Sequence, residues 1–192
     1  AWGCGGYYND IPLGTYGEIG TYSFDFAKTM TTGEGGMVVF KDKKLYDKAA
    51  AWHDHGHENN PEFPRWEDSR SSSGYNYRMN EMQGAVGLAQ LKKLDFVVNE
   101  QRKNAKLIMD AISDLPGIEC RKFNDEDGAQ GDTLIFSLKS PDDAIGFEKI
   151  LNENGFGTKI LPEAIDWHFG GVWSHILSNF TQYKDSDLEK RY

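Results

Sequence analysis

The sequence predicts an α/β fold built from two successive parts. Short segments rich in β-branched and aromatic residues alternate with stretches in which apolar residues recur every three or four positions. Hydrophobic residues make up 39% of the 192-residue chain and charged residues 27%, which is a globular balance. The chain contains no internal repeat and no low-complexity segment. We expect a domain boundary near residue 98.

The first part predicts two strands and a helix around a glycine-rich turn. Residues 20–26 carry aromatic and β-branched side chains, and residues 36–40 are apolar throughout, as in a strand buried on both faces. Residues 42–52 place their apolar side chains on one side of a short helix. The many glycines beside both strands indicate turns and close backbone approaches.

A polar stretch with no periodicity follows at residues 53–70. At about 18 residues it is long for a connection within a compact domain, and long connections are usually functional or mobile. Helical stripes of apolar residues resume at Met79 and again over residues 105–115, where Pro116-Gly117 is a clear stop. We therefore expect two helices after the loop.

The second part predicts a small α/β unit. Residues 118–123, 133–138 and 158–161 are strand candidates. Ser140 is the expected N-cap of a helix that has Pro141 at its first position and acidic residues in its first turn. A later glycine is expected to end this helix.

Charge and cysteine content exclude several classes of function. Lys and Arg number 21 against 30 Asp and Glu, and the net charge of −9 argues against a nucleic-acid or membrane partner, because both need a basic face. The apolar runs are too short to span a bilayer, and no signal peptide is visible. Cys4 and Cys120 form no disulfide framework and lack a neighbouring base, so we expect inert thiols and a cytoplasmic protein.

The most informative stretch runs from Ser23 to Gly36. Lys28 follows a buried-looking strand and precedes a turn dense in Thr and Gly that leads into the next strand. A lysine is costly at the end of a buried strand unless it is paired or used, and desolvation there favours the neutral amine that a Schiff base needs. The upstream hydroxyl of Ser23 suits a phosphate. A solvated lysine that leads into a glycine turn is the alternative.

This stretch resembles the pyridoxal-phosphate lysine segment of the DegT-type sugar aminotransferases, which are fold-type-I enzymes. The shared pattern is Ser-Phe, three residues, Lys, and then Gly-Glu-Gly-Gly before a short apolar strand. The resemblance continues downstream into the segment Gly-Tyr-Asn-Tyr-Arg-Met-Asn-Glu at residues 74–81. It implies that residues 1–98 are the C-terminal part of a cofactor-binding large domain with a mostly parallel sheet. Residues 99–192 would be a small C-terminal α/β domain, apparently truncated.

The resemblance also implies roles for individual residues. Lys28 would be the catalytic residue and bind pyridoxal phosphate covalently, and Ser23 would hold the phosphate of this cofactor. Asn76 would reach the phosphate bound by the neighbouring subunit, because the family builds each site at the interface of a homodimer. Arg78 has a planar fork that suits a carboxylate or phosphate of the substrate, with a surface ion pair as the alternative.

Three histidines, His53, His55 and His57, alternate within the long polar loop. Such imidazoles could converge on a metal ion from one face of a strand, but the loop has no strand pattern and Gly56 favours a turn. The His-Gly pair also resembles one in the family that is not a metal site, so we expect none. His55 is a candidate substrate residue on a lid, and a solvated loop is the alternative.

A late segment, residues 165–169, is rich in aromatic side chains. Aromatic and His side chains beside a pocket can hold a sugar, and satisfied packing in a core is the alternative. The family places a His near this position at the substrate mouth. The resemblance therefore makes His168 a further candidate substrate residue.

The activity implied by the resemblance is transfer of an amino group, with glutamate as the expected donor, to a sugar carbonyl. Related sugar dehydratases have histidine in place of the lysine, so Lys28 favours amino transfer. The acceptor would be a nucleotide-linked keto-sugar used in polysaccharide biosynthesis. The residues around 53–57 and 65–68 also resemble enzymes that aminate an eight-carbon keto-deoxy sugar acid, which is the second possibility for the acceptor.

Two features of the family are expected just before Ala1. They are the acid that pairs with the pyridine nitrogen and the aromatic ring that stacks on the cofactor. We therefore expect the chain to be the middle and C-terminal part of an enzyme of about twice its length. The rival interpretation is a non-catalytic fragment or paralogue that serves dimerisation or ligand sensing.

The missing upstream half has a consequence for burial. Strands that lack their neighbours leave their edges and faces bare. We therefore expect exposed apolar area in the first 98 residues, and better burial in the unit after residue 118. The side chains on which this exposure should concentrate are those of Tyr22, Phe24, Val38 and Phe40.

Overall fold

The computed structural model describes residues 3–161 and residue 173. The chain divides into two units, one formed by residues 1–115 with 120–136 and the other by residues 116–119 with 137–192. Residue 98 lies inside a continuous helix, so the division between the units falls later than the boundary expected from the sequence. The division into a large and a small domain stays a prediction.

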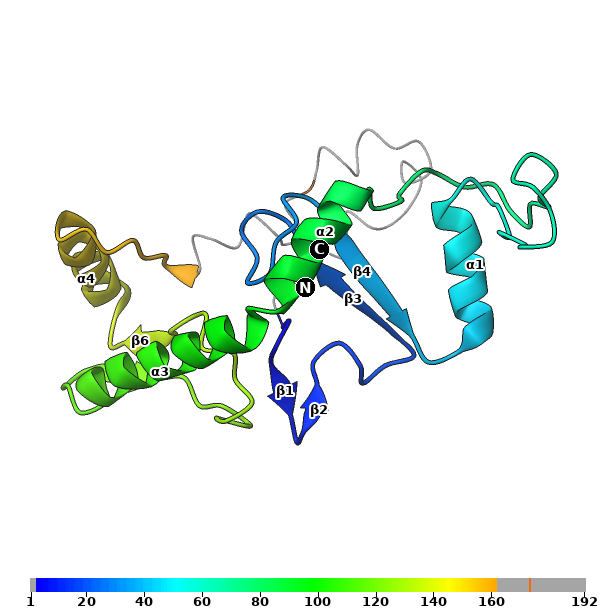
Figure 1. Ribbon diagram of the computed structural model, residues 1–192. Helices are drawn as coiled ribbons and strands as arrows, with labels where there is room; N and C mark the ends of the chain where they lie inside the picture. Colours follow the sequence, from blue (N-terminus) through cyan, green and yellow to red (C-terminus); the bar gives the residue numbers. More distant parts are fainter. Residues whose placement is uncertain (1–2, 162–172, 174–192) are drawn as a thin grey trace, which may run out of the picture. The chain divides into compact units, whose positions relative to one another are not determined.

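Two paired strands lie at the centre of the first unit (Figure 1). β3 (Ile19–Ser23) and β4 (Gly36–Phe40) pair antiparallel along their full length. Both strands were predicted, but their direction corrects the expectation of a mostly parallel sheet for this part of the chain. The connecting residues 24–35 form turns and contain no helix, whereas the crossover between parallel strands is usually helical.

A tight hairpin precedes this pair. β1 (Tyr7–Tyr8) and β2 (Ile11–Pro12) are antiparallel and are joined by Asn9 and Asp10. Both turn residues have positive φ, 47° and 61°, which matches the twist of a two-residue hairpin. Strands of two residues carry no periodic pattern, and for this reason they could not be predicted from the sequence.

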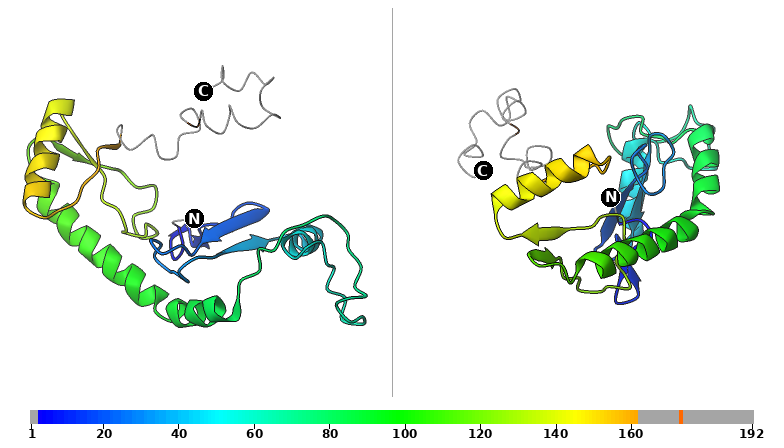
Figure 2. Two further views of the ribbon diagram at one scale, coloured as in Figure 1. Left: turned by 90° about the horizontal axis from the view of Figure 1, so that it is seen from above. Right: turned by 90° about the vertical axis from the view of Figure 1, so that its left-hand side faces the viewer.

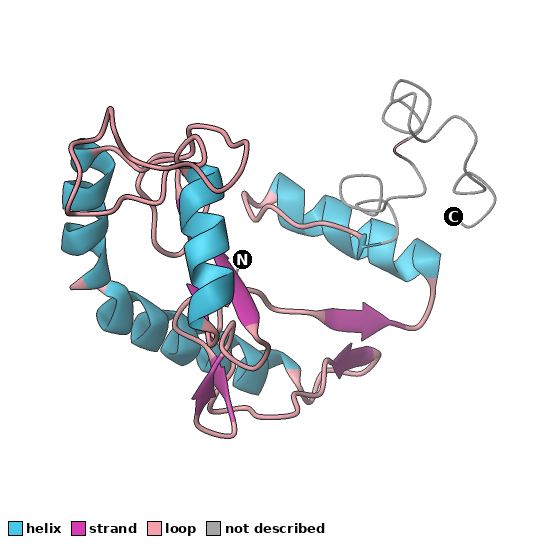
Figure 3. Cartoon of the chain, turned by 90° about the vertical axis from the view of Figure 1, so that its right-hand side faces the viewer, coloured by secondary structure: helices cyan, strands magenta, loops and turns pink. Residues whose placement is uncertain are grey.

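The helix α1 (Lys43–His53) follows β4 and confirms the helix predicted over residues 42–52. Its N-cap is Asp42, whose carboxylate accepts two backbone N–H groups of the first turn. The connection from α1 to α2 (Glu81–Leu91) is loop, as Figure 3 shows. The irregular stretch predicted after residue 53 is thus present and extends to residue 80.

Two helices follow the loop, as predicted. α2 begins at an Asn80 cap, whose side chain and that of Gln83 each accept the other residue's backbone N–H. α3 (Leu94–Ile112) starts two residues after α2 ends and is the long continuous helix in Figure 2. Its Val98 side chain is only 2% exposed and belongs to the small core of the first unit.

The later part of the chain contains two short strands and a helix. β5 (Ile118–Cys120) and β6 (Phe136–Leu138) form a two-stranded sheet, and α4 (Pro141–Glu153) follows. The Ser140 hydroxyl accepts the N–H of Asp143, which confirms the predicted N-cap. The predicted strand at 158–161 is wrong. Residues 156–160 pair with no strand among the described residues, and a segment without a partner does not form a ladder.

The first 98 residues expose many apolar side chains, as predicted, but only one of the four named side chains is among them. Val38 is 49% exposed, whereas Tyr22 and Phe40 are half-buried. Phe24 is only 4% exposed because the chain turns back over the end of β3 and covers it.

The prediction that the later unit would be better buried is wrong. A single helix beside two short strands offers little apolar surface, and side chains in and after α4 stay more than half exposed: Ile145, Ile150 and Phe156. No helix within the described residues is both long and apolar enough to cross a membrane.

Candidate functional site

Lys28 lies on a turn that begins where β3 ends at Ser23. We call residues 24–35 the lysine turn. The Asp25 carboxylate accepts the N–H of Ala27 at 2.7 Å, and the Asp25 carbonyl accepts the N–H of Lys28 at 3.1 Å. An aspartate that bonds the backbone two residues ahead is a common way to start a tight turn. The local sequence therefore fixes the backbone that carries Lys28.

Buried side chains hold the lysine turn on both sides of Lys28. Phe24 and Met30 are 4% and 6% exposed, whereas Phe26 at the outer edge of the turn is 79% exposed. The Thr32 N–H donates to the Phe24 carbonyl at 2.9 Å, which closes the turn across its base. Lys28 is thus half-buried between two anchored residues.

Four residues near Lys28 carry hydroxyl groups, and one of these hydroxyls is uncommitted. Thr31 and Thr32 donate their hydroxyl hydrogens to carbonyls within the turn, and the Thr29 hydroxyl oxygen accepts from Gln130. The Ser23 hydroxyl makes no hydrogen bond to any residue of 3–161 or 173. This hydroxyl is therefore available for a phosphate, and the Lys28 amine can condense with an aldehyde. This donor set fits pyridoxal phosphate.

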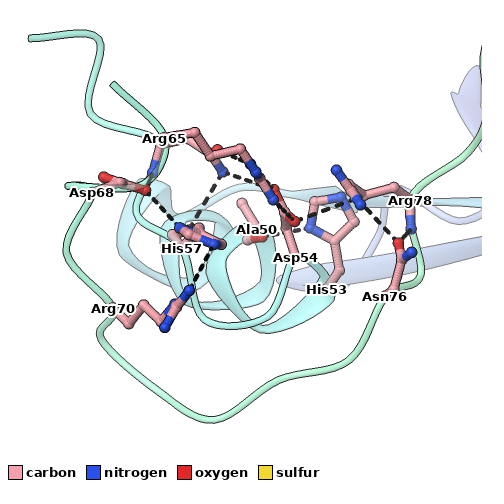
Figure 4. Close-up of polar contacts among 10 residues, drawn as sticks. Ala50, His53, Asp54, His57, Arg65, Asp68, Arg70, Asn76 and Arg78 are labelled. Atoms are coloured by element: carbon pink, nitrogen blue, oxygen red, sulfur yellow. Dashed lines mark hydrogen bonds and ion pairs between the residues drawn. The ribbon is translucent and has the colours of Figure 1, made fainter. Parts of the chain in front are cut away.

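A second cluster of polar side chains lies in the connection between α1 and α2. We call residues 54–78 the acid–arginine loop. Asp54 follows α1 and its carboxylate is 5% exposed. Arg65 donates to both oxygens of this carboxylate at 2.5 and 3.0 Å, and Arg78 Nε lies 3.3 Å from one of them (Figure 4). One buried acid thus organises two arginines.

The electrostatics of Asp54 follow from this geometry. The hydrogen bonds from Arg65, helped by Asn59 and the positive charge of Arg78, lower the pKa of Asp54 to about 2, although burial acts in the opposite direction. The same carboxylate raises the pKa of Arg65. Asp54 is therefore ionised at neutral pH.

Asn76 and Arg78 lie together beside Asp54. The Asn76 side-chain oxygen accepts from Arg78 Nε at 3.1 Å, and Asn76 forms an isolated antiparallel bridge with Asp54. The Arg78 side chain is 45% exposed and ion-paired with Asp54, as in the surface ion pair that the sequence left open as the alternative for this residue. Its remaining exposed N–H groups leave room for an additional anionic partner.

The three alternating histidines do not converge. His53 Nδ1 lies 2.5 Å from the Ala50 carbonyl oxygen. His57 is buried, with its Nδ1 3.1 Å from the Asp68 carboxylate and its Nε2 3.3 Å from the Arg70 guanidinium. His55 is exposed and has a positive φ of 56°. Among the described residues, no group of three or more His, Cys, Asp or Glu side chains could hold a metal ion.

Asp68 fastens the far end of the acid–arginine loop. Backbone N–H groups of Asn60 and Asn59 donate to its carboxylate, and His57 contacts the same group. These bonds, with that of Asn60 the largest cause, lower the pKa of Asp68. His168 lies outside the described residues, so its predicted substrate role stays a prediction.

Two residues that matter to these sites were not singled out from the sequence. Asp54 gives only a local signal, an acid flanked by histidines at the end of a helix, and its arginines lie 11 and 24 positions away. Gln130 gives no signal, since its hydroxyl partner Thr29 is 101 positions distant.

Comparison with known proteins relates the chain to sugar-modifying enzymes. It is 40% identical over 111 residues to GDP-perosamine synthase of Escherichia coli O157:H7, covering 58% of this chain and 29% of that protein. It is 35% identical over 145 residues to GDP-4-keto-6-deoxy-D-mannose 3-dehydratase of Yersinia pseudotuberculosis, covering 69% of this chain and 37% of that protein. The chain thus spans less than half the length of these relatives.

Comparison with solved structures leads to the same class of enzymes and identifies the fold. The sugar aminotransferase CalS13 from Micromonospora echinospora matches with a TM-score of 0.72 and 27% identity, over 87% of this chain and 44% of that one. The chain therefore has part of the α/β fold of fold-type-I sugar aminotransferases, as predicted, whereas the small C-terminal domain stays a prediction. Residues 1–168 match the family model, and the chain belongs to the DegT/DnrJ/EryC1/StrS aminotransferase family.

Proposed function

We propose that this chain is part of a pyridoxal-phosphate-dependent aminotransferase that delivers an amino group to a nucleotide-linked keto-sugar. The observation that carries the proposal is the lysine turn, which holds Lys28 between buried anchors and leaves the Ser23 hydroxyl without a hydrogen bond to the residues that the structure describes. Membership of an aminotransferase family supports it. The cytoplasm stays the predicted location.

The chemistry divides between the cofactor and the chain. Pyridoxal phosphate, when bound, supplies the electron sink that makes a neighbouring C–H bond acidic. The Lys28 amine would hold the cofactor, and its Nζ would act as general base and acid, taking a proton from one carbon and returning it to another. The Ser23 hydroxyl would bind the cofactor phosphate.

The relatives favour a nucleotide-linked acceptor. GDP-perosamine synthase and the dehydratase are both named for GDP-linked sugars, and a Helicobacter pylori relative is named a UDP-amino-sugar transaminase. None of these names refers to an eight-carbon keto-deoxy sugar acid, so we do not propose that acceptor. Glutamate stays the predicted donor. Among these relatives is a dehydratase. The presence of lysine at position 28, where related dehydratases have histidine, favours amino transfer over dehydration.

The substrate residues and the dimer belong to the same proposal. Arg78 and His55 are exposed residues of the acid–arginine loop. They would contact the sugar nucleotide, together with His168. Asn76 and Arg78 would serve the Lys28 of a second subunit in a homodimer. Mixing inactive Lys28→Ala and Asn76→Ala proteins should then restore about a quarter of wild-type activity, because half of the dimers carry one intact site of two. No recovery on subunit exchange would contradict the shared site.

Covalent trapping tests the central assignment. The purified full-length protein should bind pyridoxal phosphate, and borohydride should fix the cofactor on the peptide that contains Lys28. Lys28→Ala should abolish both trapping and amino transfer. Lys48→Ala is the matched control, since Lys48 is an exposed lysine of α1 and its loss should change neither.

The same experiment separates the proposal from its rival. Trapping on another lysine would remove Lys28 from the mechanism. Failure of the full-length protein to bind the cofactor at all would favour a non-catalytic member of the family that serves dimerisation or ligand sensing.

A further inference from the structure

A segment far along the chain is fastened to the N-terminal hairpin. We call residues 125–131 the strap. The Gly128 carbonyl accepts the Tyr7 N–H at 3.0 Å, and the Asp125 carboxylate accepts the N–H groups of Asn9 and Gly128, both at 2.9 Å. These bonds, with that of Gly128 the largest cause, lower the pKa of Asp125. The strap therefore has a fixed position within the first unit.

The helix α3 secures the strap from the other side. Arg102 Nε donates to the Ala129 carbonyl at 2.8 Å, and its guanidinium also reaches the Gly5 carbonyl at 3.3 Å. A side chain at Gly131 would lie 2.7 Å from the Arg102 backbone nitrogen, so the strap lies directly against α3. A side chain on this segment is consequently held by both a helix and a hairpin.

Gln130 is the strap residue that points to the lysine turn. Its side chain is buried, with the residue only 7% exposed. Its amide nitrogen donates to the Cys4 carbonyl at 2.5 Å and to the Thr29 hydroxyl oxygen at 2.9 Å. Both hydrogens of the amide are used, so its orientation is fixed. Gln130 thus joins three segments of the chain next to Lys28.

We propose that Gln130 is a positioning residue for Lys28, acting through the Thr29 hydroxyl. The inference rests on the proposed function, because it assumes that Lys28 is the lysine that holds pyridoxal phosphate. The Asp25 carbonyl restrains the Lys28 backbone from the preceding side, and the bond from Gln130 to Thr29 restrains it from the following side. With both restraints, the backbone at Lys28 is held on either side, which fixes the point from which its side chain leaves the turn.

The chain offers a matched control for this bond. Gln83 also donates its side-chain amide to the lysine turn, at 2.8 Å, but to the carbonyl of Glu34 at the far end. Gln130→Ala and Gln83→Ala therefore each remove one amide bond to the same turn and one bond elsewhere, to the Cys4 carbonyl and to the Asn80 N–H respectively. Only the first removes a bond to the residue next to Lys28.

The test measures the rate at which borohydride traps pyridoxal phosphate on Lys28, relative to Lys48, in the full-length protein. Gln130→Ala should lower the Lys28 rate about threefold to tenfold, which is the effect of one neutral hydrogen bond. Gln83→Ala should leave it unchanged. Thr29→Val should lower the trapping rate on Lys28 to the same extent, whereas Thr29→Ser should keep the wild-type rate. The double variant Gln130→Ala/Thr29→Val should trap no more slowly than either single variant.

The outcomes separate this inference from the proposed function. Wild-type trapping on a lysine other than Lys28 would overturn both. Normal trapping on Lys28 in the wild type, with the same rate in Gln130→Ala, would overturn the inference alone. Equal losses in Gln130→Ala and Gln83→Ala would also overturn it, because they would reflect general loosening of the turn. Thermal unfolding of each variant ensures that rates are compared below the transition.

Discussion

The lysine turn and the acid–arginine loop are both irregular connections, yet different interactions hold them. The lysine turn is closed by backbone groups and threonine hydroxyls and is anchored by buried Phe24 and Met30. The acid–arginine loop is held by charged groups, with Asp54 bonded to two arginines and Asp68 bonded to backbone N–H groups and His57. Apart from the Asp25 carboxylate that starts it, the first connection depends on neutral contacts, whereas the second depends on ionised carboxylates.

This difference assigns the two connections different tasks. In the lysine turn, one carboxylate, that of Asp25, supports the backbone, and the other anchors are neutral. A network of ions instead keeps several N–H groups of Arg65 and Arg78 exposed and pre-oriented, which suits contact with a charged substrate. The comparison predicts that the acid–arginine loop is the more sensitive to substitution and to acid.

The largest effect is expected at Gly56 in the acid–arginine loop. Its φ is +83°, and a Cβ there would lie 1.8 Å from the backbone oxygen of Ser72. Gly56→Ala should lower the free energy of unfolding by about 3 kcal/mol, from a left-handed backbone combined with overpacking. Urea unfolding measures this. A loss no greater than that of a glycine in open space would show that the loop is not densely packed.

Removal of the central charge should have the next largest effect. Asp54→Asn keeps the shape of the side chain but leaves Arg65 and Arg78 without their shared carboxylate. From the pKa of about 2, we expect a loss of about 2 kcal/mol at pH 7. Asp47→Asn is the control, because Asp47 pairs with Lys43 at 2.6 Å on the exposed face of α1 and should contribute under about 0.5 kcal/mol. Equal losses of unfolding free energy in the two variants would mean that the buried ion pairs of Asp54 contribute no more to stability than the exposed pair of Asp47.

Acid should erase the difference between wild type and Asp54→Asn. A carboxyl whose pKa is lowered by folding stabilises the protein above its unfolded pKa of about 3.9. That contribution is lost as the pH falls through the folded value of about 2. The two unfolding free energies should therefore differ most above about pH 5 and converge toward pH 2. Parallel curves over this range would contradict the charge-based account of the loop.

The same two regions show what sequence reasoning can reach. The lysine turn was predictable because its signals are local: a strand, threonines and glycines surround Lys28 within a few positions. The N-cap Ser140 was predictable for the same reason. The partners of Asp54 could not be predicted, because a long loop without periodicity brings them together. The strand predicted at 158–161 failed because a strand needs a neighbour as well as a pattern.

The smallest effect isolates backbone strain in the lysine turn. Gly33 has nearly the same φ as Gly56, +82°, but a Cβ there would meet nothing within 4 Å. Gly33→Ala should therefore cost only the left-handed conformation, about 1 kcal/mol. Gly84, inside α2, has equally open surroundings, and Gly84→Ala should stabilise the protein by about 0.5–1 kcal/mol because alanine favours a helix. Opposite signs for these two variants, measured by urea unfolding, would assign the cost at Gly33 to its φ alone. A loss at Gly33 as large as that at Gly56 would instead mean that the lysine turn is packed as tightly as the acid–arginine loop, and the contrast between the two connections would be wrong.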